Sequence, residues 1–352
     1  SSSPALMLAL TAVLAVSSCG RETKEDFGDA IAFSASAERV TDSRSTGSAL
    51  VTNLNTDGSE IAVYGYHGGA SDYSGKTPVF ETDGAKRVYY SSGNVGTKKW
   101  DYDYIDGTNK VKWIRSDYYR FRAFYPYSLL SKVNPSSNAE ILALDYSLMT
   151  DDDDLMVAYA TRFPANDGVG AVELNFKHAL SALKFVVKKE NSNDEEKIKE
   201  FYLTGLYKAG GLIYKSSDDE KLNGDQTLNW IVNPNLSDDD TPVHHWKTDN
   251  ENEYRTIVPD GVTVYGKDGY VFAIPMNGED ESGSTVKNLP KISAHFRTDR
   301  GGTVLHTAQL PDILWEPGKK YIYTITVKKA TVTVNVTKKP WTLVEAGAEM
   351  KF

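Results

Sequence analysis

The clearest pattern in the sequence is an alternation of apolar and polar residues that changes phase in mid-chain. From Val172 to Phe176, apolar residues occupy the even-numbered positions, which is the period of a half-buried strand. Leu183, Phe185 and Val187 then occupy odd-numbered positions, in alternation with Lys184 and Lys188. One continuous strand cannot change phase without turning every side chain to the other face of the sheet. We therefore expect the chain to break near His178–Ser181, where one domain ends and the next begins.

Short runs of the same kind recur along the chain, and no long stretch keeps a helical period. Turn-forming Gly, Asn, Asp and Ser residues separate these runs. Many short strands with regular turn signals predict an all-β protein, here as two tandem antiparallel β-sandwich domains over residues 20–178 and 179–352. The expected strands are Ala30–Ser36, Ile61–Tyr66, Arg87–Ser91, Val111–Arg115, Tyr118–Tyr125, Ile141–Leu144, Leu155–Ala160, Ile198–Thr204, Leu212–Tyr214, Arg255–Val258, Tyr270–Ile274, Lys291–Phe296, Val304–Leu310, Tyr321–Val327 and Thr331–Thr337.

Residues 1–19 have the features of a lipoprotein signal peptide. The apolar run Ala5–Val16 is too short to span a bilayer but suits the apolar core of a signal peptide. Small residues follow it and then the only cysteine, Cys19, an order that resembles a bacterial lipobox. The resemblance implies lipidation of Cys19 and an outer-membrane lipid anchor at the cell surface. The alternative is an ordinary signal peptide in which this cysteine occurs by chance.

Composition narrows the classes of partner and cofactor. The net charge is −9 and no basic stripe is present, so we expect no nucleic-acid partner. A single cysteine excludes an intramolecular disulfide and a cysteine-rich metal site. A polar stretch after the first expected strand contains Arg39 and Arg44, and we expect it to be exposed and accessible to proteases.

Residues that could support catalysis or metal binding form no convincing set. The Asp-rich segment from Asp101 has Ile105 and Lys112 where an EF-hand loop needs oxygen ligands. The segments Asp151–Asp154 and Asp238–Asp240 could hold a cation loosely, but exposed loops are the simpler interpretation. The pair His244-His245 is a possible metal-binding pair, but no third ligand is evident and we interpret it as a surface loop. We interpret His178 as a hydrogen-bonded structural residue. We expect no enzymatic activity, no cofactor and no metal.

Several motifs in order along the chain resemble the fimbrillin family of Bacteroidetes, the subunits of type V pili. They are the lipobox, the Arg-containing linker, FRAFYP (Phe121–Pro126), the segment from Asp154, LNFKHALSALKF (Leu174–Phe185), WEPGKKYIYTITV (Trp315–Val327) and the terminal strand with Trp341. The resemblance implies two transthyretin-like β-sandwiches and export as a lipoprotein. It also implies that an Arg-specific protease removes the first strand in members that polymerise, with Arg44 as the first choice of site and Arg39 as the second. Unprocessed linker arginines are the alternative.

That resemblance implies assembly into a cell-surface fimbria with other fimbrial subunits. Removing the first strand, with Ile31, Phe33 and Ala35 on its apolar face, would leave an open edge and an apolar groove for a strand from the next subunit. Three alternating residues make the last strand a candidate donor: Val332, Val334 and Val336. The alternative is that this strand completes its own C-terminal domain.

Two other functions remain open. A monomeric surface lipoprotein could bind a host protein or a glycan through exposed aromatic residues, for which Trp100, Tyr102 and Tyr104 are the candidates. A hydrolase is the weakest alternative, because no acid–base pair emerges from the sequence. Fold alone does not distinguish these functions.

Overall fold

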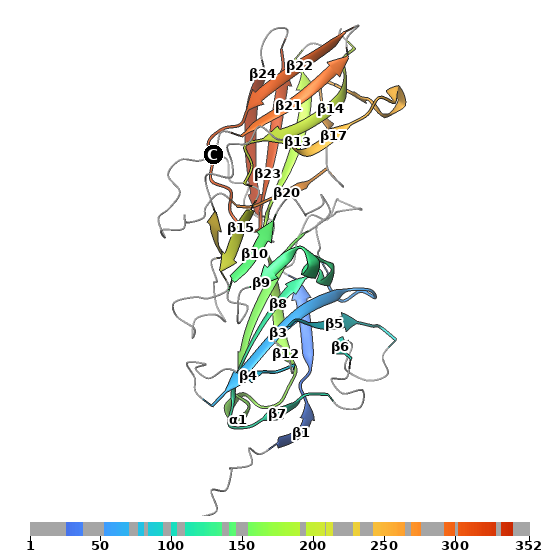
Figure 1. Cartoon of the computed structure of the whole chain (residues 1–352). Coiled ribbons are helices and arrows are strands. Elements are labelled where there is room, and N and C mark those ends of the chain that lie inside the picture. Colours follow the sequence, from blue (N-terminus) through green and yellow to red (C-terminus); the bar gives the residue numbers. More distant parts are fainter. Residues whose placement is uncertain are drawn as a thin grey trace, which may run out of the picture.

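The computed structural model of the chain is elongated, with the N-terminal half of the sequence at one end and the C-terminal half at the other (Figure 1). Strands dominate both halves. No helix in the described ranges is long and apolar enough to cross a membrane. The structure describes residues 26–37, 53–69, 77–80, 84–93, 100–103, 110–135, 141–145, 154–190, 195–207, 209–213, 228–232, 242–264, 269–275, 292–299, 302–328 and 332–340.

The strands lie where the sequence alternates between apolar and polar residues, and two halves can be distinguished along the chain. The first half contains β1 (Asp26–Ala30), β2 (Phe33–Ala37), β3 (Glu60–Gly68), β4 (Thr77–Pro78), β5 (Lys86–Tyr90), β6 (Trp100–Tyr102), β7 (Lys112–Ile114), β8 (Tyr118–Tyr125), η1 (Tyr127–Ser131), β9 (Val133–Pro135), β10 (Ile141–Asp145), β11 (Met156–Arg162), α1 (Pro164–Asp167) and β12 (Val172–His178). The second half contains β13 (Ser181–Lys189), β14 (Lys197–Thr204), β15 (Ala209–Ile213), β16 (Asn229–Val232), β17 (Val243–Lys247), η6 (Glu251–Glu253), β18 (Arg255–Thr256), β19 (Val262–Thr263), β20 (Val271–Ala273), β21 (Ser293–Asp299), β22 (Thr303–Gln309), β23 (Lys319–Val327) and β24 (Val332–Pro340).

The N-terminal half is built on one large sheet that folds over on itself. Seven of its strands lie in the order β2-β12-β11-β8-β3-β5-β6, and β4 pairs with β3. The edge strands β2 and β6 come into contact, so the sheet encloses a core of its own. Phe121, Trp113 and Leu174 are fully buried in that core. The small sheet of β1 and β7 lies at the far end of this half (Figure 1).

Two five-stranded sheets form the C-terminal half. One has the order β19-β13-β23-β24 with β20 on β13, and the other has the order β17-β14-β21-β22 with β18 on β14. Their apolar faces meet in the core, where the ring centroids of Phe185 on β13 and Phe201 on β14 are 5.1 Å apart. The all-β fold is confirmed. The pairing is not purely antiparallel, however, because β2 runs parallel to β12 and β13 runs parallel to β23.

The chain breaks between the halves at the place where the alternation changes phase. β12 ends at His178 and β13 begins at Ser181, so only Ala179 and Leu180 separate the two strands, and both are buried. A four-stranded sheet, β16-β15-β10-β9, also joins the halves, because β10 comes from the first and β15 from the second. A domain boundary after residue 178 stays a prediction.

Several hydrogen bonds tie this junction together. The indole nitrogen Nε1 of the fully buried Trp230 donates to the carbonyl oxygen of Ala179 over 2.8 Å. The backbone nitrogen of Gly318 donates to the carbonyl oxygen of Leu180 over 2.9 Å. Gly318 has a φ of 66°, a left-handed conformation that glycine adopts without steric cost. The turn before β23 is therefore held against the junction.

Candidate functional site

The first strand lies at an edge of the N-terminal sheet. β2 pairs with β12 alone, in parallel, from Phe33 opposite Val172 to Ala37 opposite Phe176. The expected strand Ala30–Ser36 is present, but it is interrupted at Ile31 and Ala32. Before this interruption the chain leaves the large sheet and pairs, as β1, with β7. The alternation did not reveal the interruption, because Ile31 is buried like a residue inside a strand.

The side chain of Phe33 fills an aromatic socket in the N-terminal core. Phe33 is 4% exposed, and its ring meets that of Phe121 edge-on with centroids 5.4 Å apart. The rings of Tyr102 and Phe80 lie 5.9 Å and 6.2 Å from it. Ile31 and Ala35 are buried in the same core. Removing the first strand would expose this socket, since β2 covers it.

Polar contacts hold the interrupted part of the strand in place. The backbone nitrogen of Ile31 donates to the carbonyl oxygen of Val111 over 2.7 Å. The backbone nitrogen of Val172 donates to the carbonyl oxygen of Ala32 over 2.8 Å. The hydroxyl of Tyr102 donates to the carbonyl oxygen of Ile31 over 2.9 Å. Burial raises the pKa of Tyr102 to about 12. The tyrosine is therefore neutral and able to donate across the physiological range.

The last strand, which contains the candidate donor residues, lies in its own C-terminal sheet. β24 is an edge strand that pairs along its whole length with β23. Val332, Val334 and Val336 point toward the core but are only half-buried. A cavity of about 400 Å³ lies between β24 and the end of β22. The strand thus completes its own domain in this structure, and no other described strand pairs with its second edge.

The aromatic residues expected to form an exposed binding platform do not do so. Trp100 and Tyr102 are 5% and 2% exposed, so the interpretation of these two as surface residues is wrong. β6 faces inward, because it closes the folded sheet against β2. The indole nitrogen of Trp100 donates to Oδ1 of Asn55 over 2.8 Å. Tyr104 lies outside the described residues.

Three further predicted site residues also lie outside the described ranges. They are the lipidation site Cys19 and the processing sites Arg44 and Arg39. Lipidation and processing therefore stay predictions.

Those candidate histidines and carboxylates that the structure describes make structural contacts, whereas residues 151–153 and 238–240 lie outside the described ranges. Nδ1 of the buried His178 lies 3.0 Å from Oδ1 of Asp154, so His178 is the hydrogen-bonded structural residue that we expected. Asp154 is 2% exposed, which corrects its assignment to an exposed loop, and the sequence offered no sign of this pairing. His244 and His245 lie on strand β17, so the interpretation of this pair as a loop is wrong. Nε2 of the buried His244 lies 2.8 Å from the carbonyl oxygen of Phe272, and of the two residues only His245 is exposed. Within the described residues, no three potential ligands converge on a metal position.

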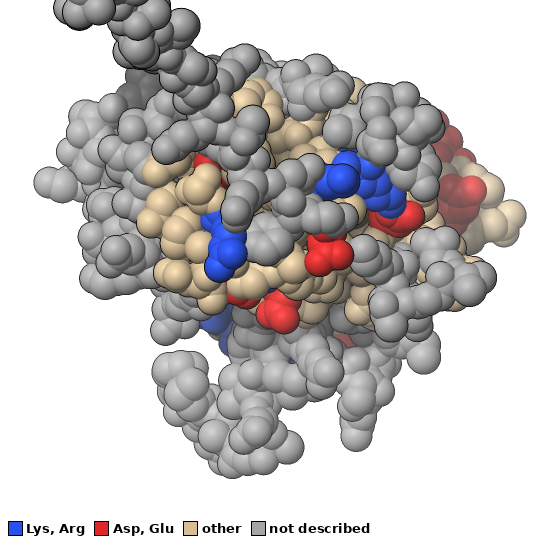
Figure 2. Space-filling view, turned by 90° about the horizontal axis from the view of Figure 1, so that it is seen from below, with Lys and Arg blue, Asp and Glu red and all other residues tan. Residues whose placement is uncertain are grey.

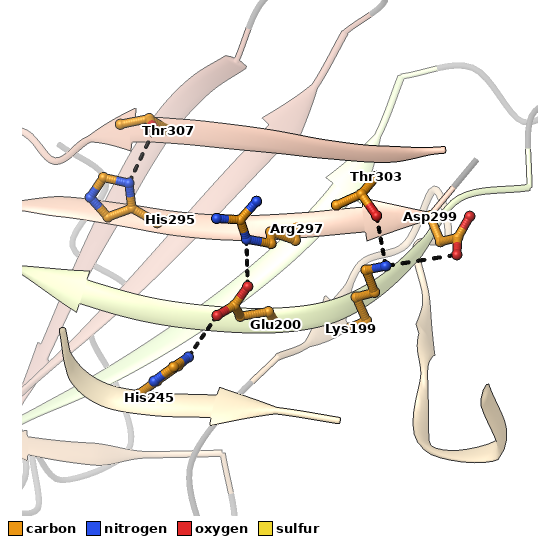
Figure 3. A network of polar contacts seen from close by, with 8 residues as sticks. All are labelled: Lys199, Glu200, His245, His295, Arg297, Asp299, Thr303 and Thr307. Carbon is orange, nitrogen blue, oxygen red and sulfur yellow. Dashed lines mark hydrogen bonds and ion pairs between the residues drawn. The ribbon is translucent and has the colours of Figure 1, made fainter. Parts of the chain in front are cut away.

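The polar face of the sheet β17-β14-β21-β22 forms a second candidate surface (Figure 3). Glu200 bridges neighbouring strands, with its carboxylate oxygens 2.8 Å from Nε2 of His245 and 2.6 Å from Nε of Arg297. On the same strand, the ring of Tyr202 stacks on His295 at a centroid distance of 4.6 Å. This stacking covers one face of the tyrosine ring, and the ring of His245 lies roughly perpendicular to it at a centroid distance of 5.5 Å. The arrangement suits cross-strand stabilisation better than glycan binding.

Charges of both signs are exposed at the end of the N-terminal half. Viewed from below, the described surface shows basic and acidic side chains close to one another (Figure 2). No single sign dominates this part of the described surface. Such a mixed surface does not favour a polyanion, in agreement with the net charge of the chain.

Comparison with known proteins identifies the family. The profile of the fimbrillin-like family matches residues 39–341. A fimbrial protein from Bacteroides vulgatus is similar in structure, with a TM-score of 0.55 and 17% identity over 88% of this chain and 99% of its own. A protein from Bacteroides ovatus to which a role in cell adhesion is attributed has a TM-score of 0.50 and 15% identity over 90% of this chain and 99% of its own. No curated protein matches the chain. Because the matched profile covers most of the sequence, the chain belongs to the fimbrillin-like family.

Proposed function

We propose that this protein is a subunit of a cell-surface fimbria that assembles by donor-strand exchange after proteolytic removal of its first strand. Family membership makes the chain a fimbrial structural protein of the cell surface rather than an enzyme. The proposal adds export as a lipoprotein, with lipidation at Cys19 and an outer-membrane anchor. It also adds processing at Arg44, or at Arg39 if Arg44 is not used.

The observation that supports strand exchange is the position of β2. It is an edge strand that pairs only with β12, and the segment removed with it also contains β1, which pairs with β7. It also buries a large side chain, that of Phe33, in an aromatic socket. An unpaired edge beside an exposed apolar face is a template for another strand. An incoming strand would recover both the backbone hydrogen bonds and the apolar contacts.

The proposed donor is β24, with Val332, Val334 and Val336 facing the acceptor groove. Two features support it: β24 is an edge strand, and its valines are only half-buried. Donation requires its release from β23, with which it now pairs. Because the groove lies in the N-terminal half and β24 in the C-terminal half, the contact would be head-to-tail. Head-to-tail contacts give an open fibre wherever the rotation between successive subunits does not close a ring.

Treatment of the purified, unlipidated protein with an Arg-specific protease tests this function. Cleavage after Arg44, verified by mass spectrometry, should give filaments visible by electron microscopy and increased light scattering. An Arg44→Ala variant should remain intact in the linker and monomeric, or assemble only after cleavage at Arg39. Cleaved protein that stays monomeric would refute the stalk role and favour an anchor, a tip or a monomeric adhesin.

A further inference from the structure

β22 is an uncharged strand at the edge of a sheet in the C-terminal half. It pairs with β21 on one side, and no other described strand pairs with its second edge. Its sequence, TVLHTAQ, contains no Lys, Arg, Asp or Glu. Proteins commonly protect open edges with charged residues or proline, and β24, the edge strand of the opposing sheet, ends in Lys338, Lys339 and Pro340. β22 lacks this protection, so it is a template for another strand.

The backbone groups of alternate residues on β22 face the open edge. Just beyond the strand, the backbone nitrogen of Leu310 donates to the carbonyl oxygen of Ile292 over 2.8 Å. Hydrogen-bonded pairs alternate with non-hydrogen-bonded pairs along an antiparallel ladder. In the register of β21 and β22, the even-numbered residues of β22 therefore bond to β21. The odd-numbered residues direct their N–H and C=O groups away from β21, and they are Thr303, Leu305, Thr307 and Gln309.

Apolar side chains are exposed on both faces of β22. Val304 lies opposite Thr298, which is fully buried, so Val304 points to the core side of the sheet. It is nevertheless 47% exposed, and Leu305 on the outer face is 45% exposed. The cavity of about 400 Å³ lies on the core side, between Ala308 and two valines of β24. The described part of the core is therefore left open along β22.

We propose that β22 is the strand through which two copies of the chain pair edge to edge, antiparallel and about a two-fold axis at His306. In this register, Thr303 lies opposite Gln309 of the second copy, and Leu305 lies opposite Thr307. The backbone groups that face the open edge on each copy then bond to one another. Because β22 carries no charged residue, the pairing brings no like charges together.

The second copy also supplies a side chain that fits the cavity. Val304 of the second copy lies opposite Ala308, on the core side of the joined sheet. It therefore points toward the cavity that Ala308, Val332 and Val334 line. By symmetry, each copy fills the cavity of the other, as in any two-fold interface. This match favours a second copy of the chain over an unrelated strand as the occupant.

The contact belongs to the weak class of interfaces. One pair of seven-residue strands buries less than the about 1,200 Å² at the lower end of stable interfaces. The uncleaved chain is therefore monomeric when dilute and associates as its concentration rises. Copies arrayed along a fibre would multiply the contact. Pairing through β22 requires neither cleavage nor strand exchange, so its failure would leave the proposed function intact.

Sedimentation velocity of the uncleaved chain, at concentrations from about 10 μM to about 1 mM, tests the association. A matched pair of variants locates it. Leu305→Lys places a positive charge in the middle of β22, where the lysines of the two copies become diagonal neighbours. Leu314→Lys is the control, because Leu314 is 48% exposed and lies outside β22. Circular dichroism verifies that both variants are folded.

The average mass of the unaltered chain should rise with concentration toward that of a dimer. Leu305→Lys should weaken the association at least about tenfold, equivalent to about 1.4 kcal/mol, and Leu314→Lys should leave it unchanged. A mass that stays monomeric over the whole range overturns the proposal. Equal association of all three proteins also overturns it, because the contact would then lie elsewhere.

Disulfide trapping tests the register, with the only native cysteine replaced by Cys19→Ser. Opposite residues of a hydrogen-bonded pair have Cα atoms about 5.5 Å apart, within the about 4.4–6.8 Å that a disulfide spans. Diagonal neighbours lie about 7–8 Å apart. Under mild oxidation, a mixture of Leu305→Cys and Thr307→Cys chains should therefore form linked dimers much faster than either variant alone. Equal linking in the mixture and in the single variants, or none in any sample, would overturn the two-fold pairing.

Discussion

Replacing Phe33 by alanine tests whether the first strand is held mainly by one side chain. The ring is 4% exposed and contacts three other aromatic rings, those of Phe80, Tyr102 and Phe121. Truncation of a buried phenylalanine removes its apolar burial and leaves a cavity, which together cost about 3–5 kcal/mol. The aromatic pairs, worth about 0.5–1.5 kcal/mol each beyond buried area, are part of this total and not an addition to it. We expect Phe33→Ala to destabilise the N-terminal half by about 4 kcal/mol.

This expectation can be measured by urea unfolding followed by near-ultraviolet circular dichroism, which reports the packed aromatic rings. Hydrogen exchange of β2 and β12 amides then locates the loss in the N-terminal half. Leu305→Ala is the control, because Leu305 is 45% exposed on β22 and its truncation should change the free energy of unfolding by less than about 0.5 kcal/mol. A loss under about 1 kcal/mol for Phe33→Ala would show that the groove does not depend on this ring.

Three other predictions follow from buried or hydrogen-bonded ionisable groups. Burial raises the pKa of Tyr102 to about 12, so displacement of the first strand should return this pKa toward about 10. In a titration followed by ultraviolet absorbance, one more tyrosine should then ionise near pH 10. Hydrogen bonds from Ser92 lower the pKa of Asp57 in the folded protein. The contribution of Asp57 to the free energy of unfolding is therefore complete above about pH 4, and it is lost as the pH falls through the folded-state pKa. The stability difference between Asp57→Asn and the unaltered protein should therefore shrink below about pH 4 in urea titrations; an unchanged difference would contradict the assignment. Asp154→Ala should cost about 2–4 kcal/mol because the buried His178 loses its carboxylate partner, and a loss under about 1 kcal/mol would argue against this role.

Local alternation in the sequence was sufficient to locate most strands. The break after His178 is a local property, since the change of phase forces it, and the structure has β12 and β13 on either side. The strand Tyr118–Tyr125 was also predicted with its observed bounds. Alternation does not identify partners distant in sequence. The parallel pairing of β2 with β12 and the pairing of β10 with β15 therefore had no local signal.

The candidate site was predicted only in part for the same reason. The apolar face of Ile31, Phe33 and Ala35 was recognisable, and all three side chains are buried. The sequence did not reveal that the side chains of Trp100 and Tyr102 point into the core, because a three-residue strand is too short to show which face lies inward. The interruption at Ile31 and Ala32 arises from a change of partner between β1 and β2, which only the folded chain reveals.

The tied junction between the halves has a geometric consequence for any fibre built from this chain. The groove under β2 belongs to one half and β24 to the other, while Trp230, Gly318 and the shared sheet fix the halves to one another. Each added subunit would thus repeat the same rotation and the same advance along the axis. The pitch and handedness of such a screw would then depend on the fixed angle between the halves at the junction as well as on the contacts between subunits.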